Sequence, residues 1–96
     1  MDNRTMELNR IATMYYDEIF NYCRRRVRTN DDAYDLTQDV FLALSASFDN
    51  INVKSVRKWL YATARNKIAD YHKSKKIEKD NRTYVDLSDD VVNLFE

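Results

Sequence analysis

A basic segment in the second half of the chain carries the residues with the clearest chemical potential. Residues 54–79 hold nine Lys or Arg and two Asp or Glu, a net charge of +7. Cationic side chains at this density can neutralise the phosphates of a nucleic acid, and the release of counterions makes such binding steeply salt-dependent. The alternative is a solvated basic helix. The candidate phosphate-binding residues are Lys54, Arg57, Lys58, Arg65, Lys67, Lys73, Lys75 and Lys76.

Side chains that could read bases lie in and beside this segment. Asn50, Asn52 and Ser55 offer donors and acceptors for base edges, and Asn66 adds another amide. We interpret Tyr61 as an exposed aromatic that could stack on a base. The alternatives are turn chemistry for the two asparagines before the helix and an ordinary exposed tyrosine.

The rest of the chain is acidic. Residues 1–53 hold six Lys or Arg and nine Asp or Glu, and residues 80–96 hold one Arg and five acids, so the full chain has zero net charge. Asp35, Gln38, Asp39 and Leu42 recur at helical spacing and form an acidic stripe with one apolar side chain. Such a stripe complements a basic coiled coil, although a solvated helix face is the alternative.

The elements that must position these residues are helices. The chain has no Gly and no Pro, which argues against tight hairpins and phosphate-cradling loops. Apolar spacing predicts an all-α, compact bundle of three main helices at about 4–28, 31–46 and 56–77, with a loop at 47–55. The expected inner faces comprise Leu8, Ile11, Tyr15, Ile19, Tyr22, Cys23, Ala33, Leu36, Thr37, Val40, Phe41, Leu44, Val56, Trp59, Leu60, Thr63, Ala64, Ile68 and Tyr71.

The boundaries of the helices follow from capping chemistry. Thr29 or Asn30 can cap the second helix, and Ser55 is the expected cap of the third. The arginine run 24–28 resembles a nucleic-acid patch, but it equally suits the negative end of a helix dipole. Ala69 is expected on the outer side of the third helix. We predict one domain at 1–78, followed at 79–96 by a linker or short terminal helix.

Several function classes find no support in the sequence. Cys23 is the only cysteine, so no intrachain disulfide can form and a reducing, cytoplasmic location is expected. No signal peptide or stretch of about 20 apolar residues is present, so no membrane insertion is expected. His72 has no partner at metal-ligand spacing, and no nucleophile–base pair is evident. We therefore predict no metal, no cofactor and no enzymatic activity.

Two blocks of the sequence resemble region 2 of the sigma-70 superfamily, in its extracytoplasmic-function (ECF) group. Residues 32–44 read DAYDLTQDVFLAL and residues 56–71 read VRKWLYATARNKIADY, and the similarity covers about residues 8–77. The chain departs from the family at Ser45 and Ala46, where a Trp is frequent, and at Ala62 and Thr63, where Arg-Ile is frequent. The family's second domain, which reads the −35 element, has no counterpart here. The chain is expected to be part of a longer protein, the alternative being an unusual single-domain member.

The resemblance implies a transcription initiation factor. The second helix would dock on the clamp helices of the largest subunit of core RNA polymerase. The third helix and the preceding loop would capture a flipped, unpaired base of the promoter −10 non-target strand without ATP, and an anti-sigma factor would be a further partner. Two alternatives remain: a helix-turn-helix regulator that reads duplex DNA, against which the long loop argues, and a protein-interaction adaptor that does not bind DNA.

Overall fold

The computed structural model describes residues 2–79, with side chains described as far as Lys75. This part of the chain forms three α-helices, α1 (Asn3–Arg24), α2 (Asn30–Ser47) and α3 (Val56–Lys79). Two short 3-10 turns, η1 (Phe48–Asn50) and η2 (Val53–Ser55), connect α2 to α3, and no strand occurs within residues 2–79. The prediction of an all-α bundle is confirmed. The predicted tail lies outside the described residues, apart from Lys79 at the end of α3.

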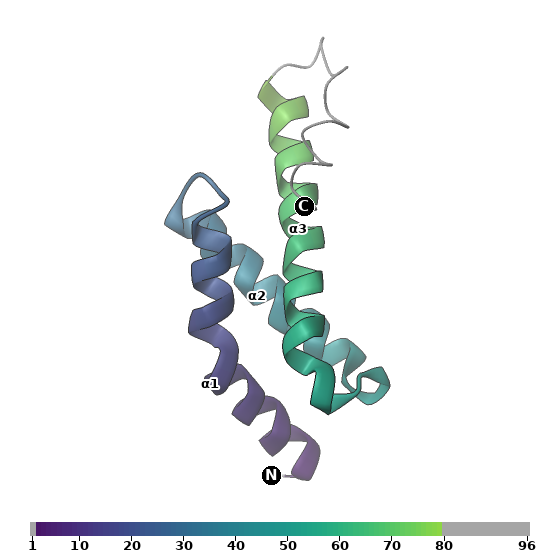
Figure 1. Ribbon diagram of the computed structural model, residues 1–96. Coiled ribbons are helices and arrows are strands. Elements are labelled where there is room, and N and C mark those ends of the chain that lie inside the picture. Colours follow the sequence, from purple (N-terminus) through teal and green to yellow (C-terminus); the bar gives the residue numbers. More distant parts are fainter. Residues whose placement is uncertain (1, 80–96) are drawn as a thin grey trace.

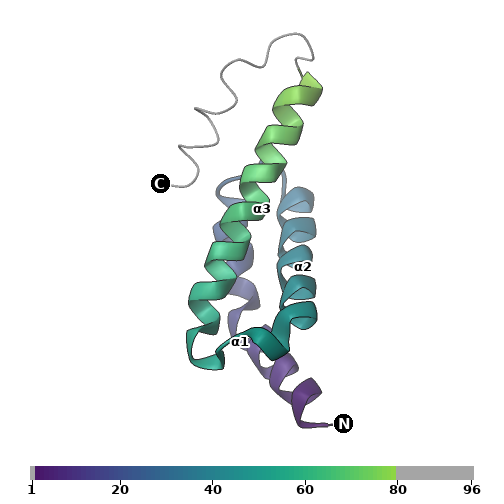
Figure 2. The ribbon, with the colours of Figure 1, turned by 90° about the vertical axis from the view of Figure 1, so that its right-hand side faces the viewer.

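The three helices contact one another in pairs. α2 packs against both α1 and α3, and α1 also contacts α3. In Figure 1, α2 passes behind the other two helices, from the α1–α2 connection at the top to the 3-10 turns at the bottom. The view in Figure 2 shows that the C-terminal end of α3 extends beyond α1 and α2. The first half of α3 therefore belongs to the bundle and its last turns project from it.

Apolar residues at helical spacing fill the space between the helices. Because each helix buries one stripe, the core draws on all three. Its buried members are Ile11, Ile19, Cys23, Ala33, Leu36, Val40, Leu44, Val56, Leu60, Ala64 and Ile68. Thr37 is also fully buried, and its hydroxyl donates to the carbonyl of Ala33 at 2.7 Å. Trp59 and Tyr71 are half-buried and pack on the edge of this core.

Side-chain caps define where the first two helices begin. The carboxylate of Asp2 accepts from the amide of Thr5 at 2.8 Å, at the start of α1. Thr29, rather than Asn30, caps α2, because its hydroxyl accepts from the amide of Asp32 at 3.0 Å. Ser55, the predicted cap of the third helix, is the last residue of the turn η2 and directly precedes α3.

The connection between α1 and α2 folds onto α3. α1 ends at Arg24, four residues earlier than predicted, and Arg26 and Arg28 of the connection contact His72 and Tyr71 of α3. The Tyr71 hydroxyl accepts from the Arg28 amide at 3.2 Å and donates to Asp32 at 2.6 Å. His72 Nε2 lies 2.5 Å from the carbonyl oxygen of Arg26. These contacts replace the last turn that periodicity predicted for α1.

The covered part of α3 also corrects one prediction of orientation. Ala69 was expected on the outer side of the third helix, but it is only 3% exposed. It precedes His72 by one turn, near the place where the α1–α2 connection packs on α3. Tertiary packing therefore buries a position that helical periodicity alone assigns to solvent.

The Thr29 cap provides a test of this part of the fold. Thr29→Ala removes the acceptor of the Asp32 amide and should lower the free energy of unfolding by about 1 kcal/mol. For a domain of this size the melting temperature should fall by about 4–8 °C, measured by circular dichroism. Thr29→Ser keeps the hydroxyl and should melt close to the unmodified chain. Equal losses in both variants would show that the methyl group, and not the cap, stabilises this site.

Candidate nucleic-acid and protein interfaces

A cationic groove runs along the first half of α3. Its volume is about 800 Å³, and it brings together six of the residues predicted to bind DNA: Lys54, Ser55, Arg57, Lys58, Tyr61 and Arg65. Tyr22 of α1 and Ala62 of α3 complete its lining. One cation on η2 and three on the first turns of α3 can meet successive phosphates of a strand. The groove therefore combines phosphate-binding groups with aromatic rings.

Tyr61 is held in place more firmly than the sequence indicated. It was predicted to be an exposed aromatic, but it is half-buried and packs against the core. Its hydroxyl donates to Glu18 of α1 at 2.6 Å, and its ring meets the ring of Tyr22 edge-on at 4.9 Å between centroids. The packing of α1 against α3 causes this burial. A base could therefore stack only on the part of the ring that faces the groove.

Glu18 joins the two neighbouring side chains of the groove. Its carboxylate accepts from Tyr61 and forms an ion pair with Arg57 at 2.5 Å. The hydrogen bond from Tyr61 and the one from Arg57 lower the pKa of Glu18 below its ordinary value. Burial, and then the bond to Glu18, raises the pKa of Tyr61, so its hydroxyl remains a donor at neutral pH. Arg57 also lies over the Tyr61 ring, 5.2 Å from its centroid.

The end of α1 contributes a second aromatic–cation pair, which sequence reasoning missed. The Arg26 guanidinium lies 3.8 Å from the centroid of the Tyr22 ring and donates to the Tyr22 carbonyl at 3.0 Å. The carbonyl contact is what the helix-dipole interpretation of the arginine run predicts. The ring contact places a cation on Tyr22, which lines the groove. The only available signal was the position of Tyr22 one turn before Arg26.

Four other predicted DNA-binding residues are exposed but do not line the groove. Asn52 uses its side-chain oxygen to accept from the Lys54 amide at 3.0 Å, which is the turn chemistry considered as its alternative role. Asn50 is exposed in η1, and Asn66 and Lys73 are exposed farther along α3. Residues of η2 and of the first turns of α3 therefore line the groove, and these four residues lie outside its lining.

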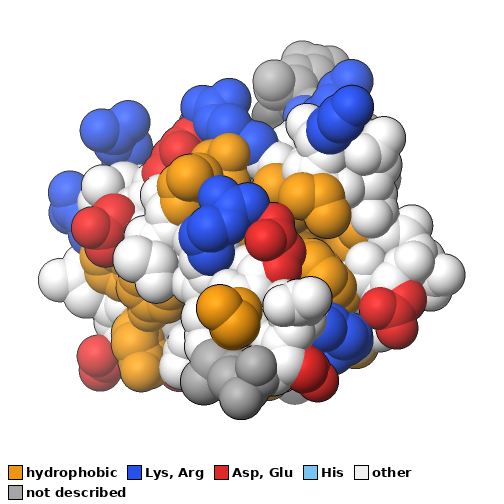
Figure 3. Space-filling model, turned by 90° about the horizontal axis from the view of Figure 1, so that it is seen from below, with side chains coloured by type: hydrophobic (Ala, Val, Ile, Leu, Met, Phe, Trp, Pro, Cys, Tyr) orange, Lys and Arg blue, Asp and Glu red, His pale blue; other side chains and the backbone are white. Residues whose placement is uncertain are grey.

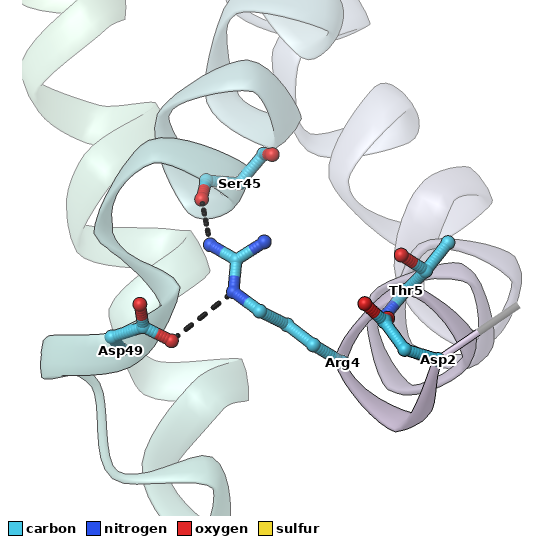
Figure 4. A network of polar contacts seen from close by, with 5 residues as sticks. All are labelled: Asp2, Arg4, Thr5, Ser45 and Asp49. Atoms are coloured by element: carbon cyan, nitrogen blue, oxygen red, sulfur yellow. Dashed lines mark hydrogen bonds and ion pairs between the residues drawn. The ribbon is translucent and has the colours of Figure 1, made fainter.

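The 3-10 turns are fixed to the start of α1 by one arginine. Arg4 donates to the carbonyl of Ser45 at 3.0 Å and pairs with Asp49 at 3.1 Å, and Figure 4 shows it spanning from α1 to these two residues. Its guanidinium also lies 5.7 Å from the centroid of the Phe48 ring. Figure 3 shows this end of the molecule, where apolar side chains are interspersed with charges of both signs. Arg4 therefore helps to position the segment that precedes the groove.

The predicted acidic stripe lies on the surface of α2. Asp35, Gln38 and Asp39 are exposed, and Leu42 is 67% exposed. The Gln38 amide donates to the Tyr34 hydroxyl at 3.3 Å, so an exposed aromatic adjoins the stripe. Asp39 also borders a hollow of about 340 Å³ between α2 and α3. The stripe lies on α2, and no residue of α2 lines the groove.

Within the part of the chain that the structure describes, three further features bear on the sequence predictions. No helix there is long and apolar enough to cross a membrane. The same residues contain no group of three or more His, Cys, Asp or Glu side chains placed to hold a metal ion. Cys23 is buried, and burial raises the pKa of its thiol.

The sequence of this three-helix bundle matches a known protein family. The model of sigma-70 region 2 matches residues 11–77, and the chain belongs to this family. It is similar to the ECF RNA polymerase sigma factor SigM of Bacillus subtilis (strain 168), with 27% identity over 92 residues, which are 95% of this chain and 53% of that protein.

A second relative agrees with this assignment. RNA polymerase sigma factor YlaC of Bacillus subtilis (strain 168) is 37% identical over 60 residues, which are 62% of this chain and 35% of that protein. The chain thus spans about half, or less, of the length of these curated relatives. No solved structure matches the chain.

The lowered pKa of Glu18 predicts how stability depends on pH. Because folding lowers this pKa, its contribution is complete above the unfolded-state pKa and is lost as the pH falls through the folded-state pKa. Glu18→Gln should lower the melting temperature at about pH 7, and the difference from the unmodified chain should narrow towards about pH 3. Asp17→Asn, at an exposed neighbour, is the control and should show no such narrowing. A difference for Glu18→Gln that stays constant with pH would contradict the assignment.

Proposed function

We propose that this domain docks on core RNA polymerase through α2 and captures the unpaired non-target strand of a promoter −10 element along α3. The observation that carries the proposal is the separation of an acidic stripe on α2 from a cationic, tyrosine-lined groove on α1 and α3. The groove includes Tyr22 and Tyr61. The two surfaces suit two partners of opposite charge.

The docking step depends on α2. Asp35 and Asp39 can attract a basic coiled coil and set its register, and the exposed Leu42 can supply an apolar contact that resists dissociation. The names of the relatives support polymerase as the partner. The docking site that we propose on it is the pair of clamp helices of its largest subunit. An anti-sigma factor that competes for these surfaces, and a cytoplasmic location, stay predictions.

The DNA step depends on the groove and on the turn before it. Lys54, Lys58 and Arg65 would contact phosphates, and Tyr61 would offer the exposed part of its ring to a base. Asn50 and Ser55 would supply polar groups for a flipped base. Opening a base pair costs a few kcal/mol, and capture of the extruded base offsets this cost. The scheme needs no covalent step and no cofactor.

The alternatives account for fewer of these features. In a helix-turn-helix regulator a short turn precedes the recognition helix, whereas here two 3-10 turns and residues 51–52 separate α2 from α3. A protein-interaction adaptor would use the acidic stripe but would leave the cationic groove without a role. A comparison of unpaired and duplex oligonucleotides separates the three proposals, because the adaptor should bind neither at low salt.

The docking proposal predicts the effect of charge reversal on α2. Asp35→Lys and Asp39→Lys should each weaken binding to isolated polymerase clamp helices at least about tenfold, since each reverses one charge of the acidic stripe. The measurement is a pull-down followed by titration calorimetry. Asp17→Lys introduces the same charge change on α1 and should bind normally. Equal weakening by all three variants would point to net charge and not to the stripe.

The DNA proposal predicts a preference for unpaired over duplex DNA and an affinity that falls with salt concentration. The domain should prefer an unpaired −10 oligonucleotide to the same sequence as a duplex, measured by fluorescence anisotropy. Lys58→Gln and Arg65→Gln should each lower the slope of log K against log salt by about 0.7, the value for one phosphate contact on a single strand. Lys73→Gln, outside the groove, should have a smaller effect. A preference for duplex DNA would favour the helix-turn-helix alternative.

A further inference from the structure

A carboxylate lies at the side of a groove that otherwise suits a polyanion. Glu18 projects from α1 and contacts two groove-lining residues of α3, Arg57 at 2.5 Å and Tyr61 at 2.6 Å. The Glu18 side chain is 32% exposed and that of Arg57 is 62% exposed, so neither is sealed from solvent or from a ligand. A phosphate that enters the groove can therefore replace Glu18 as the partner of Arg57.

Glu18 and a phosphate compete for the same guanidinium. While Arg57 is paired with Glu18, its positive charge is largely offset locally, and a phosphate beside it gains less attraction. The carboxylate itself also repels the strand. By contrast, no ion pair within the described side chains involves the groove residues Lys54, Lys58 or Arg65. Among these groove cations, Arg57 is thus the one whose charge is offset by an ion pair within the domain.

We infer that Glu18 is an electrostatic brake on the nucleic-acid groove, a residue that sets how tightly it binds any single strand. The inference rests on the proposed function for the identity of the ligand. Sequence-independent affinity comes from phosphate contacts, so a carboxylate that occupies one phosphate-binding cation lowers that affinity in particular. The same carboxylate fixes the Tyr61 hydroxyl and so keeps its ring edge-on to Tyr22.

Glu18→Gln tests the brake with minimal change of shape. The amide oxygen still accepts from Tyr61, but the charge on Arg57 is released. Binding of a dodecamer of thymidine should tighten about twofold to fivefold, the value of one partly exposed ion pair. The slope of log K against log salt should steepen by about 0.7, because one more phosphate is neutralised. Asp17→Asn removes an equal charge from an exposed neighbour and should leave the slope unchanged.

The same substitution in an Arg57→Gln variant shows whether the effect of Glu18→Gln on binding depends on Arg57. In Arg57→Gln, addition of Glu18→Gln should no longer steepen the slope, since the released cation is missing. Thermal melts of each variant establish that all are folded at the temperature of the assay. The inference is overturned if Glu18→Gln binds no more tightly than Asp17→Asn, or if the change in slope persists without Arg57.

These outcomes are separable from failure of the proposed function. If the unmodified domain binds the thymidine dodecamer as tightly as the −10 strand, selective −10 capture is wrong while the brake can still be measured. If the −10 strand is preferred but Glu18→Gln changes nothing, the proposed function stands and the brake is wrong. If the unmodified domain binds neither strand at low salt, both are wrong.

Discussion

The burial of one apolar stripe of α3 determines most of this structure. Val56, Leu60, Ala64 and Ile68 recur every four residues and are almost completely buried against α1 and α2. Because a helix that buries one stripe must expose the opposite one, this packing also turns the basic residues between them outwards. The core and the cationic groove are thus two sides of the same helix, and a shift in its register would move both.

Local patterns were sufficient to predict the three helices and their inner faces, because the 3.6-residue period and the capping residues act over a single turn. The starts of α1, α2 and α3 fall within one residue of the prediction. The early end of α1 and the burial of Ala69 could not be predicted in this way. The residues that follow α1 contact Tyr71 and His72 of α3, partners that are 43 and 46 residues apart in the sequence, and the burial of Ala69 is likewise a result of tertiary packing.

The candidate groove also combines residues that the local sequence pattern identifies with residues that only tertiary packing brings to it. The cations and Tyr61 belong to one short segment, so charge and spacing identified them. Glu18 and Tyr22 come from α1, and their contacts with Tyr61 span about 40 residues of sequence. In the sequence Glu18 is one acid among several, and Tyr22 fits the apolar stripe of α1 well enough to need no second role. Only the packing of α1 against α3 joins them to the groove.

A groove whose affinity for a single strand is lowered by Glu18 suits a domain that binds DNA while it is docked on a partner. The acidic stripe and the groove belong to one bundle with a common core, so attachment through α2 would hold the groove at a fixed place near the DNA. Docking of this kind raises the effective concentration of the groove at its target, and modest affinity there is then sufficient. Away from polymerase the same modest affinity would limit binding to unrelated strands. On the proposed function, Glu18 therefore limits the binding of the free domain to unrelated strands.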